Sequence, residues 1–230
     1  RKVIERIHSY SQHLCGLIGD IIDLAVSDAG QLRLNFEYVD LGQALRLVAE
    51  SGSQLAADKG LAWEANLPES GPWVWGDQMR LRQVLLNLIN NAVKFTSSGS
   101  VSLRLVESSD SVSITVQDTG LGIPLEEQQA IFDEFRQSER SIARRYGGLG
   151  LGLAICKRLI DMHGGIITVQ STGEEGSGSA FTITLPTVHP SLEEQSLVKL
   201  LPAKPSVLIF TNRPSTSERI RDCQQQRGIE

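Results

Sequence analysis

Hydrophobic positions along the first 28 residues recur at alternating intervals of three and four, the repeat of helices that pack in coiled coils and bundles. The repeat is interrupted only at Ser11, and its members are Ile4, Ile7, Leu14, Ile18, Ile21 and Ala25. Further apolar residues widen this face beyond a two-stranded seam, which favours a four-helix bundle. Gly30 is the expected C-terminal cap. We therefore predict that residues 1–30 form a long dimerisation helix.

Beyond residue 30, stretches in which apolar and polar residues alternate are separated by stretches with helical periodicity. The alternating stretches predict strands at 31–39, 61–68, 101–107 and 111–117, and a closing hairpin made of "GGIITVQS" and "GSAFTITLP". The helical stretches predict helices from Leu41 to Lys59 before Gly60, from the N-cap Asp77 to Lys94, near 125–132, and over 151–163. Residues 31–187 are thus expected to form one domain of strands and helices.

The remaining residues change character again. Proline and serine content predicts a linker over 188–205, followed by a buried strand at 206–211 and a polar helix at 215–226. This last segment is too short to bury a core alone. It is open to two interpretations, the start of a further domain or a partly ordered tail.

Composition excludes some classes of function. The net charge is −5 over 230 residues, so there is no general basic field for nucleic acid or anionic lipid. No apolar run approaches the roughly 20 residues of a membrane span. The three cysteines are far apart, which indicates a reduced, cytoplasmic compartment without structural zinc. The chain begins without Met, so we expect a part of a longer protein.

The predicted helix that contains "LLNLINNAVKFT" carries polar residues beside its core stripe. Asn87, Asn91 and Lys94 are spaced i, i+4 and i+7 and share one face, whereas Asn90 is rotated off it. One interpretation is a set of capping amides near the end of the helix. The other is a site for magnesium and phosphate, because amide oxygens suit a hard cation and lysine suits phosphate.

Two glycine-containing stretches add candidate chemistry. In "VSITVQDTGLGIP", Asp118 shares the parity of the buried strand positions, and Gly120 and Gly122 allow close backbone approach or positive φ. An Asp-Gly turn is the simpler interpretation. A buried carboxylate beside two glycines could instead accept from the amine of adenine, which guanine replaces with a carbonyl.

The second stretch, "ARRYGGLGLGLAICKRLIDMHGG", runs from glycines directly into an apolar helix, an arrangement that favours anion binding at the helix N-terminus. Its spacing is neither that of a Rossmann fingerprint nor that of a Walker sequence. Arg140, Arg144 and Arg145 precede it on a loop that could close over phosphates.

Four motifs in order resemble the boxes of sensor histidine kinases of the hybrid type: "LLNLINNAVKFT", "DTGLGIP", "FDEFRQSERSIARRYGGLGLGLAI" and "GSGSAFTITLP". The resemblance covers about residues 1–187. It implies the α+β ATP-binding fold shared with gyrase and mismatch-repair ATPases, a two-layer sandwich whose mixed sheet is covered by helices on one face. ATP and Mg²⁺ are the implied ligands.

The resemblance also implies roles for single residues. Asn91, with Asn87, matches the magnesium ligands, and Lys94 and Arg144 match basic residues at the phosphates. Asp118 matches the residue that reads adenine. Asn87 stands where related ATPases have a water-activating glutamate, which favours transfer to histidine over hydrolysis. Further implied ATP contacts are Gly120, Gly122, Phe135, Gly148, Leu149, Gly150, Leu151 and Gly152, while Phe132 and Phe135 are expected to pack in the lid.

The chain departs from the family pattern in three places. No "SHELRTPL"-like phosphoacceptor stretch is present, and "SQHLCGLIGDIIDLAVSDAGQL" resembles the second bundle helix instead. Leu149 and Ala143 replace common threonines. Receiver domains carry paired acids where this chain has Thr211 and Asn212, so 206–230 resembles a degenerate receiver start at best.

Three functions follow as alternatives. The first is the catalytic portion of a cytoplasmic histidine kinase, dimeric through residues 1–30, that phosphorylates a histidine on an adjoining helix for relay to a response regulator or receiver domain. It would contact neither nucleic acid nor membrane through this chain, although a longer protein could be a membrane-bound sensor. The second is a pseudokinase that regulates another kinase. The third, a free ATPase, is disfavoured by Asn87.

Overall fold

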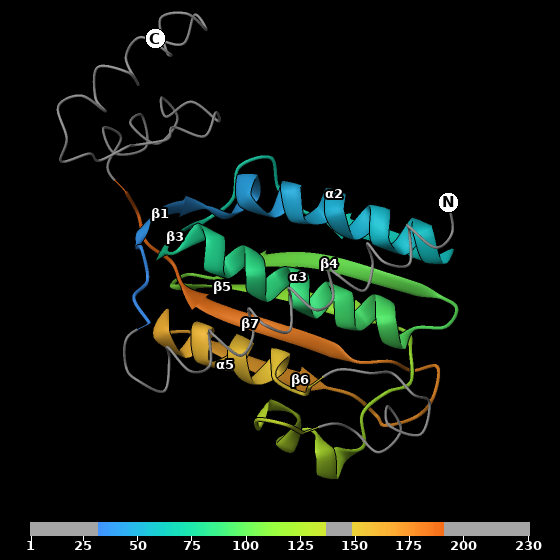
Figure 1. The fold of residues 1–230 in the computed structure, drawn as a ribbon. Coiled ribbons are helices and arrows are strands. Elements are labelled where there is room, and N and C mark those ends of the chain that lie inside the picture. Colours follow the sequence, from blue (N-terminus) through green and yellow to red (C-terminus); the bar gives the residue numbers. More distant parts are fainter. Residues whose placement is uncertain (1–31, 137–148, 191–230) are drawn as a thin grey trace, which may run out of the picture. The chain divides into compact units, whose positions relative to one another are not determined.

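The computed structural model describes residues 32–136 and 149–190, and its centre is a five-stranded mixed sheet (Figure 1). The strands follow the order β2-β4-β5-β7-β6. Their bounds are Ala62–Asn66, Ser100–Glu107, Ser111–Asp118, Ala180–Pro186 and Ile166–Gln170, in that order. β2 and β4 are parallel, and every other neighbouring pair is antiparallel. Both predicted hairpins, β4–β5 and β6–β7, are confirmed.

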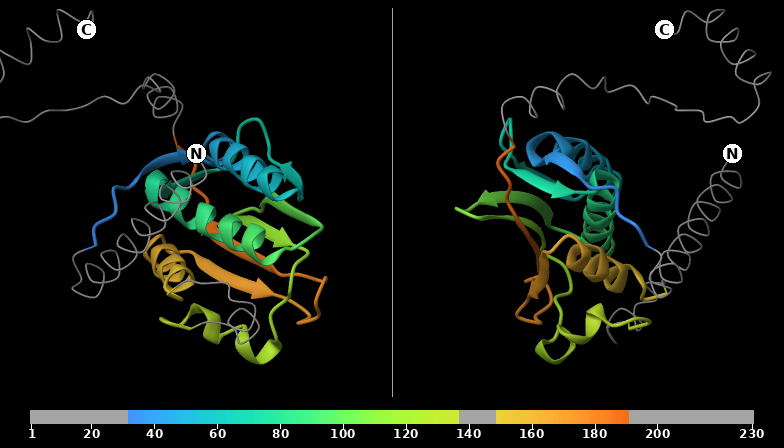
Figure 2. Two further views of the ribbon diagram at one scale, coloured as in Figure 1. Left: turned by 45° about the vertical axis from the view of Figure 1, so that its right-hand side comes forward. Right: turned by 90° about the vertical axis from the view of Figure 1, so that its left-hand side faces the viewer.

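Helices cover one face of this sheet, as Figure 2 shows from two sides. They are α2 (Leu41–Lys59), α3 (Gln78–Phe95) and α5 (Gly152–Met162). Helix α3 lies between the other two and contacts both. Its buried stripe consists of Leu81, Val84, Leu85, Leu88, Ile89, Ala92 and Val93. The predicted two-layer sandwich is therefore confirmed.

The ends of the helices lie where local chemistry predicts them. Asp77 precedes α3, and its carboxylate accepts from the backbone N–H of Arg80 at 3.1 Å and from that of Asn35 at 2.9 Å. Gly60 ends α2 in the left-handed region with φ 75°. Such a conformation costs a residue with a Cβ about 1–2 kcal/mol. The residue types at these two positions therefore predict where α2 ends and where α3 begins.

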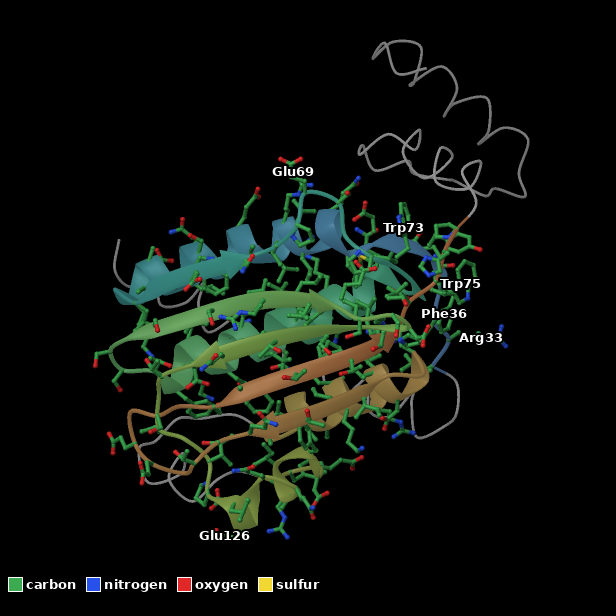
Figure 3. The ribbon with its side chains drawn as sticks, turned by 180° about the vertical axis from the view of Figure 1, so that it is seen from behind. Arg33, Phe36, Glu69, Trp73, Trp75 and Glu126 are labelled. Carbon is green, nitrogen blue, oxygen red and sulfur yellow. The ribbon has the colours of Figure 1, made fainter. Side chains whose placement is uncertain are left out.

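The N-terminal strand differs from its prediction. Instead of a strand over 31–39, β1 covers only Glu37–Asp40, and it pairs antiparallel with an unpredicted strand, β3 (Trp73–Gly76). Phe36 stacks on Trp75 with ring centroids 6.3 Å apart. Figure 3 shows Phe36, Trp73 and Trp75 together at this end of the domain. Pairing with β3 and aromatic packing therefore hold this segment in place. The alternating pattern alone predicted a strand that is longer than β1.

The predicted helix near 125–132 is replaced by two 3₁₀ turns, η1 (Leu125–Glu127) and η2 (Ala130–Phe132). A helix of one or two turns is marginal without strong packing. Here Leu125 is 79% exposed, and Ile131 supplies the buried anchor.

The domain remains hydrogen-bonded beyond its expected end, because the N–H of Val188 donates to Trp73 O at 2.8 Å. The predicted helix over residues 1–30, most of the 188–205 linker and the 206–230 segment lie outside the described residues. Among the helices that the structure does describe, none combines the length and apolar character required to cross a membrane.

Candidate functional site

The polar face of α3 is formed as its spacing predicts. Asn87 and Asn91 lie one turn apart, and the Asn91 amide donates to Asn87 Oδ1 at 3.4 Å. The Asn87 amide donates in turn to the sulfur of Cys156 on α5, also at 3.4 Å. The bond between the two asparagines is long, and sulfur is a weak acceptor, so both contacts satisfy these amides weakly. Asn91 Oδ1 accepts no hydrogen bond from the described residues, and it is thus available as a hard oxygen ligand.

Lys94 follows on the same helix, in its last turn, directly before the C-terminal residue Phe95. It is half-buried, and this burial lowers the pKa of its ammonium group. The ammonium lies 5.0 Å from the ring centre of Phe95. Lys59 on α2 donates to the carbonyls of Val93 and Lys94 at 2.5 and 2.8 Å. A second cation therefore neutralises the negative end of the α3 dipole beside Lys94.

Asp118 ends β5 on the helix-covered side, as its parity predicts, and it is only 4% exposed. Its Oδ1 accepts from the N–H of Gly120 at 2.8 Å, and its Oδ2 accepts from the hydroxyl of Ser179 at 2.6 Å. Burial raises the pKa of the carboxyl above its ordinary value, although the hydrogen bonds from Ser179 and Gly120 oppose this effect. Each carboxylate oxygen has a second lone pair, so the group can still accept from a ligand.

The loop after Asp118 depends on glycine because backbone approaches it closely. A Cβ on Gly120 would lie 2.5 Å from the carbonyl oxygen of Phe95, at the end of α3. Gly122 has φ +69°, and a Cβ there would lie 2.7 Å from the carbonyl oxygen of Glu174. The loop is thus fixed between α3 and the turn that joins β6 to β7.

The second glycine stretch brings α5 against the asparagines of α3. A Cβ on Gly152 would lie 2.5 Å from the amide nitrogen of Asn87, and Gly150 has φ +73°. The side chain of Leu151, the N-cap residue, makes no capping hydrogen bond and is buried in the core. Only the backbone of Leu151 is thus available to a ligand, while the first-turn N–H groups of α5 have the arrangement of an anion site.

The expected lid residues are brought together only in part. Phe132 packs against Phe181, with ring centroids 6.2 Å apart. Phe135, by contrast, is 66% exposed with φ 59°, so it does not pack as expected. Leu149 is 38% exposed beside the glycines. Gly148 and the basic residues Arg140, Arg144 and Arg145 lie outside the described residues.

Sequence reasoning missed Ser179. It was noted only as part of the closing hairpin, yet its buried hydroxyl is a direct partner of Asp118 across 61 positions. The signal was present in "GSGS", where small residues with positive-φ glycines Gly176 and Gly178 allow close approach to another strand.

An open groove of about 710 Å³ runs between α3 and α5. Its lining is more apolar than polar, and it includes two arginines of α3, Arg80 and Arg82. The residues that line it include Met79, Arg82, Leu86, Asn87, Ile155 and Leu159. Asn87 thus belongs both to the polar face of α3 and to this groove, and the groove gives a second molecule access to that face.

The arrangement has two chemically different ends. At the end of β5, a desolvated carboxylate and close-packed glycines form a surface that can accept hydrogen bonds from a flat base. Between α3 and α5, amide oxygens, an ammonium group and a helix N-terminus can hold a metal and phosphates. Both ends lie along α3, because Phe95 at its C-terminus contacts the Asp118 loop and Asn87 contacts Gly152.

Comparisons with known proteins agree with this geometry. Residues 76–189 match the family described as histidine kinase-, DNA gyrase B-, and HSP90-like ATPase. The circadian input-output histidine kinase CikA of Synechococcus elongatus is 39% identical over 216 residues, which cover 90% of this chain and 27% of CikA. The signal transduction histidine-protein kinase BarA of Escherichia coli is 38% identical over 192 residues, which cover 80% of this chain and 21% of BarA.

A solved structure gives the same result. The crystal structure of full-length ShkA in complex with AMPPNP aligns with a TM-score of 0.68 at 35% identity, covering 83% of this chain and 39% of the ShkA chain. The chain spans 27% and 21% of the length of CikA and BarA. Residues 76–189 therefore form a domain of the histidine kinase-, DNA gyrase B-, and HSP90-like ATPase family, and the chain is similar to the histidine kinases CikA and BarA.

Proposed function

We propose that this domain binds Mg-ATP and transfers the γ-phosphoryl group to a histidine on an adjoining bundle helix, as the catalytic portion of a two-component histidine kinase. The observation that carries the proposal is the buried carboxylate of Asp118, held by Ser179 and Gly120 at the edge of the glycine loop. Burial of a carboxylate costs stability, which these two hydrogen bonds offset in part and a bound hydrogen-bond donor would offset further.

Asp118 is the proposed reader of adenine. Its carboxylate can accept from the 6-amine of adenine, whereas the carbonyl at that position of guanine would face it with a second acceptor. The domain is therefore expected to prefer ATP to GTP, which supports the assignment of ATP as the phosphoryl donor.

The polar face of α3 is the proposed phosphate end. Asn91, whose Oδ1 accepts no hydrogen bond from the described residues, and Asn87 fit a magnesium ion by the chemistry of their amide oxygens. Bound magnesium would supply charge neutralisation and orientation of the phosphates. Lys94 is the proposed contact to a phosphate oxygen, and the N-terminus of α5 would add backbone donors. Gly148, Leu149, Gly150 and Arg144 are further proposed contacts.

Asn87 favours transfer over hydrolysis. An amide cannot take a proton from water at neutral pH, and the described part of α3 offers no carboxylate on this face. The imidazole of histidine needs no such base to attack phosphorus. Catalysis by this domain is then positioning and charge stabilisation.

The acceptor helix is proposed to bind in the α3–α5 groove. The apolar lining of this groove and its arginines suit an amphipathic helix with acidic residues. The proposal also includes a homodimer through residues 1–30, relay of the phosphoryl group to a response regulator or receiver domain, and a cytoplasmic location. The relatives include hybrid signal transduction histidine kinases of Dictyostelium discoideum, which supports the relay step.

A pseudokinase is the second candidate. Leu149 is 38% exposed beside the glycines, at a position where the family commonly has the hydroxyl of threonine.

The two candidates are separated by a transfer assay with γ-labelled ATP, magnesium and a bundle helix that carries an acceptor histidine. The kinase yields acid-labile, alkali-stable label on that helix, and Asn91→Ala lowers it at least about tenfold. Asn66→Ala, at the exposed edge of β2, is the matched control and keeps the wild-type rate. Absence of labelled helix despite ATP binding would favour the pseudokinase, and phosphate release over many turnovers without acceptor would identify an ATPase.

A further inference from the structure

The hydroxyl of Ser171 joins the two chain segments that surround Asp118. Ser171 follows β6 directly and is half-buried. Its Oγ accepts from the N–H groups of Ile123 and Gly173 at 2.9 and 3.2 Å, and it donates to the carbonyl of Gly178 at 2.6 Å. A hydroxyl has one donor and two acceptor sites. All three are used within the protein, so Ser171 acts through its neighbours and not by contact with a ligand.

The bond to Gly178 leads to one side of Asp118. The carbonyl of Gly178 belongs to the same peptide unit as the N–H of Ser179, so fixing one orients the other. Ser179 then donates its hydroxyl to Asp118 Oδ2 at 2.6 Å and accepts the Asp118 N–H at 2.9 Å. A Cβ on Gly178 would lie 1.8 Å from Asp118 O, so the turn lies directly against this residue.

The bond from Ile123 leads to the other side. Ile123 follows the glycine loop, whose Gly120 donates to Asp118 Oδ1. Gln128 further links the segments of Ile123 and Ser171, because its amide donates to Ile123 O at 3.0 Å and to Ser171 O at 2.7 Å. Gly120 O also accepts from the N–H of Gly176 at 2.8 Å. Both carboxylate oxygens of Asp118 are therefore held by groups that converge on Ser171.

We propose that Ser171, supported by Gln128, is a positioning residue for recognition of the nucleotide base: it fixes the orientation of Asp118 toward the 6-amine of adenine. This inference rests on the proposed function, and it concerns base recognition alone. Ser171 has no described contact with Asn87, Asn91 or Lys94, so the phosphate end is expected to be independent of it.

The test compares ATP with purine riboside triphosphate, which lacks only the 6-amine. The ratio of the two dissociation constants isolates the contact with Asp118, and a general loss of structure leaves this ratio unchanged. Wild-type protein is expected to prefer ATP at least about tenfold, the effect of one hydrogen bond to a charged group. Ser171→Ala is expected to reduce the preference to about threefold or less, because water can replace the hydroxyl without fixing Asp118.

Two matched variants complete the experiment. Ser171→Thr keeps the hydroxyl and is expected to restore most of the preference. Ser113→Ala removes a hydroxyl that bonds Thr184 at 3.3 Å on the open face of the sheet, and it is expected to leave the ratio unchanged. Where Ser171→Ala fails to fold, Gln128→Ala removes the two supporting bonds and supplies the same readout.

The inference is overturned when Ser171→Ala keeps the wild-type ratio, or when it weakens both nucleotides equally. A wild-type preference for ATP with an unchanged ratio in Ser171→Ala refutes this inference and leaves the proposed function standing. A wild-type protein without any preference for ATP refutes both.

Discussion

Replacing Asp118 with asparagine is expected to separate stability from binding, because the carboxylate is held for a ligand at a cost to the fold. The side chain is 4% exposed, and burial raises its pKa above the ordinary value of 3.8. Asparagine has the same shape. Its amide oxygen can accept from Gly120 while its NH₂ group donates to the hydroxyl of Ser179, so the local bonds persist without the charge.

The sign of the pH effect follows from this pKa. Between the unfolded value near 3.8 and the higher folded value, the folded state binds more protons than the unfolded one. Stability conferred by Asp118 is therefore lost as pH rises through this window, at about 1.4 kcal/mol for each unit of difference. Asp118→Asn should match or exceed the wild-type free energy of unfolding at pH 7, with an advantage that disappears below about pH 3.8.

The effect on binding has the opposite sign. A hydrogen bond to a charged group contributes about 1.5–3 kcal/mol, so its loss weakens ATP binding roughly 10- to 150-fold. The NH₂ group of asparagine, if turned toward the ligand, would also face the adenine amine with a second donor.

Urea unfolding at pH 7 and below about pH 3.8 measures the first effect, and calorimetric titration with ATP measures the second. Ser113→Ala, on the open face of the sheet, serves as the control for both. An Asp118→Asn protein that binds ATP like the wild type would refute the assignment of the base reader. One that is markedly less stable than wild type at pH 7 would refute the argument from desolvation.

Three further substitutions test other parts of the account. Gly152→Ala places a Cβ 2.5 Å from the amide nitrogen of Asn87. We expect a loss of about 1–3 kcal/mol in unfolding free energy and weaker magnesium-dependent ATP binding by calorimetry. Unchanged binding would contradict the role of Asn87. Gly60→Ala meets no atom within 4 Å but has φ +75°, so thermal unfolding should show a loss of about 1–2 kcal/mol while ATP affinity stays constant. In the wild type the buried N–H of Asp77 donates to His163 Nε2 at 2.9 Å, and His163→Ala removes this acceptor. Urea unfolding should show a loss of about 1–3 kcal/mol in unfolding free energy. A smaller loss would mean that another group accepts from this N–H.

Local chemistry made part of the fold predictable. Periodicity and the N-cap at Asp77 gave α3 within a residue of its observed end, and Gly60 marked the end of α2. Parity alone placed Asp118 on the buried face of β5. In each case the determining interactions lie within a few residues of the chain, so the local pattern contains the information.

What could not be predicted depends on distant contacts. β3 is only four residues long and exists through pairing with β1, between residues that are far apart in the sequence, from Asp40–Trp73 to Glu37–Gly76. The bond between Ser179 and Asp118 requires that β7 lie beside β5, a strand order that no local pattern states. The segment after Pro124 forms two 3₁₀ turns in place of its predicted helix, and Gln128 between them bonds Ser171 O, 43 positions away, a contact that no local pattern states.

Calorimetric titration of this chain with ATP, with and without magnesium and with GTP as the comparison, tests the central claim most directly. The account predicts binding that is selective for ATP, strengthened by magnesium and greatly weakened in Asp118→Asn. No detectable binding at millimolar ATP, or equal binding of ATP and GTP, would contradict it.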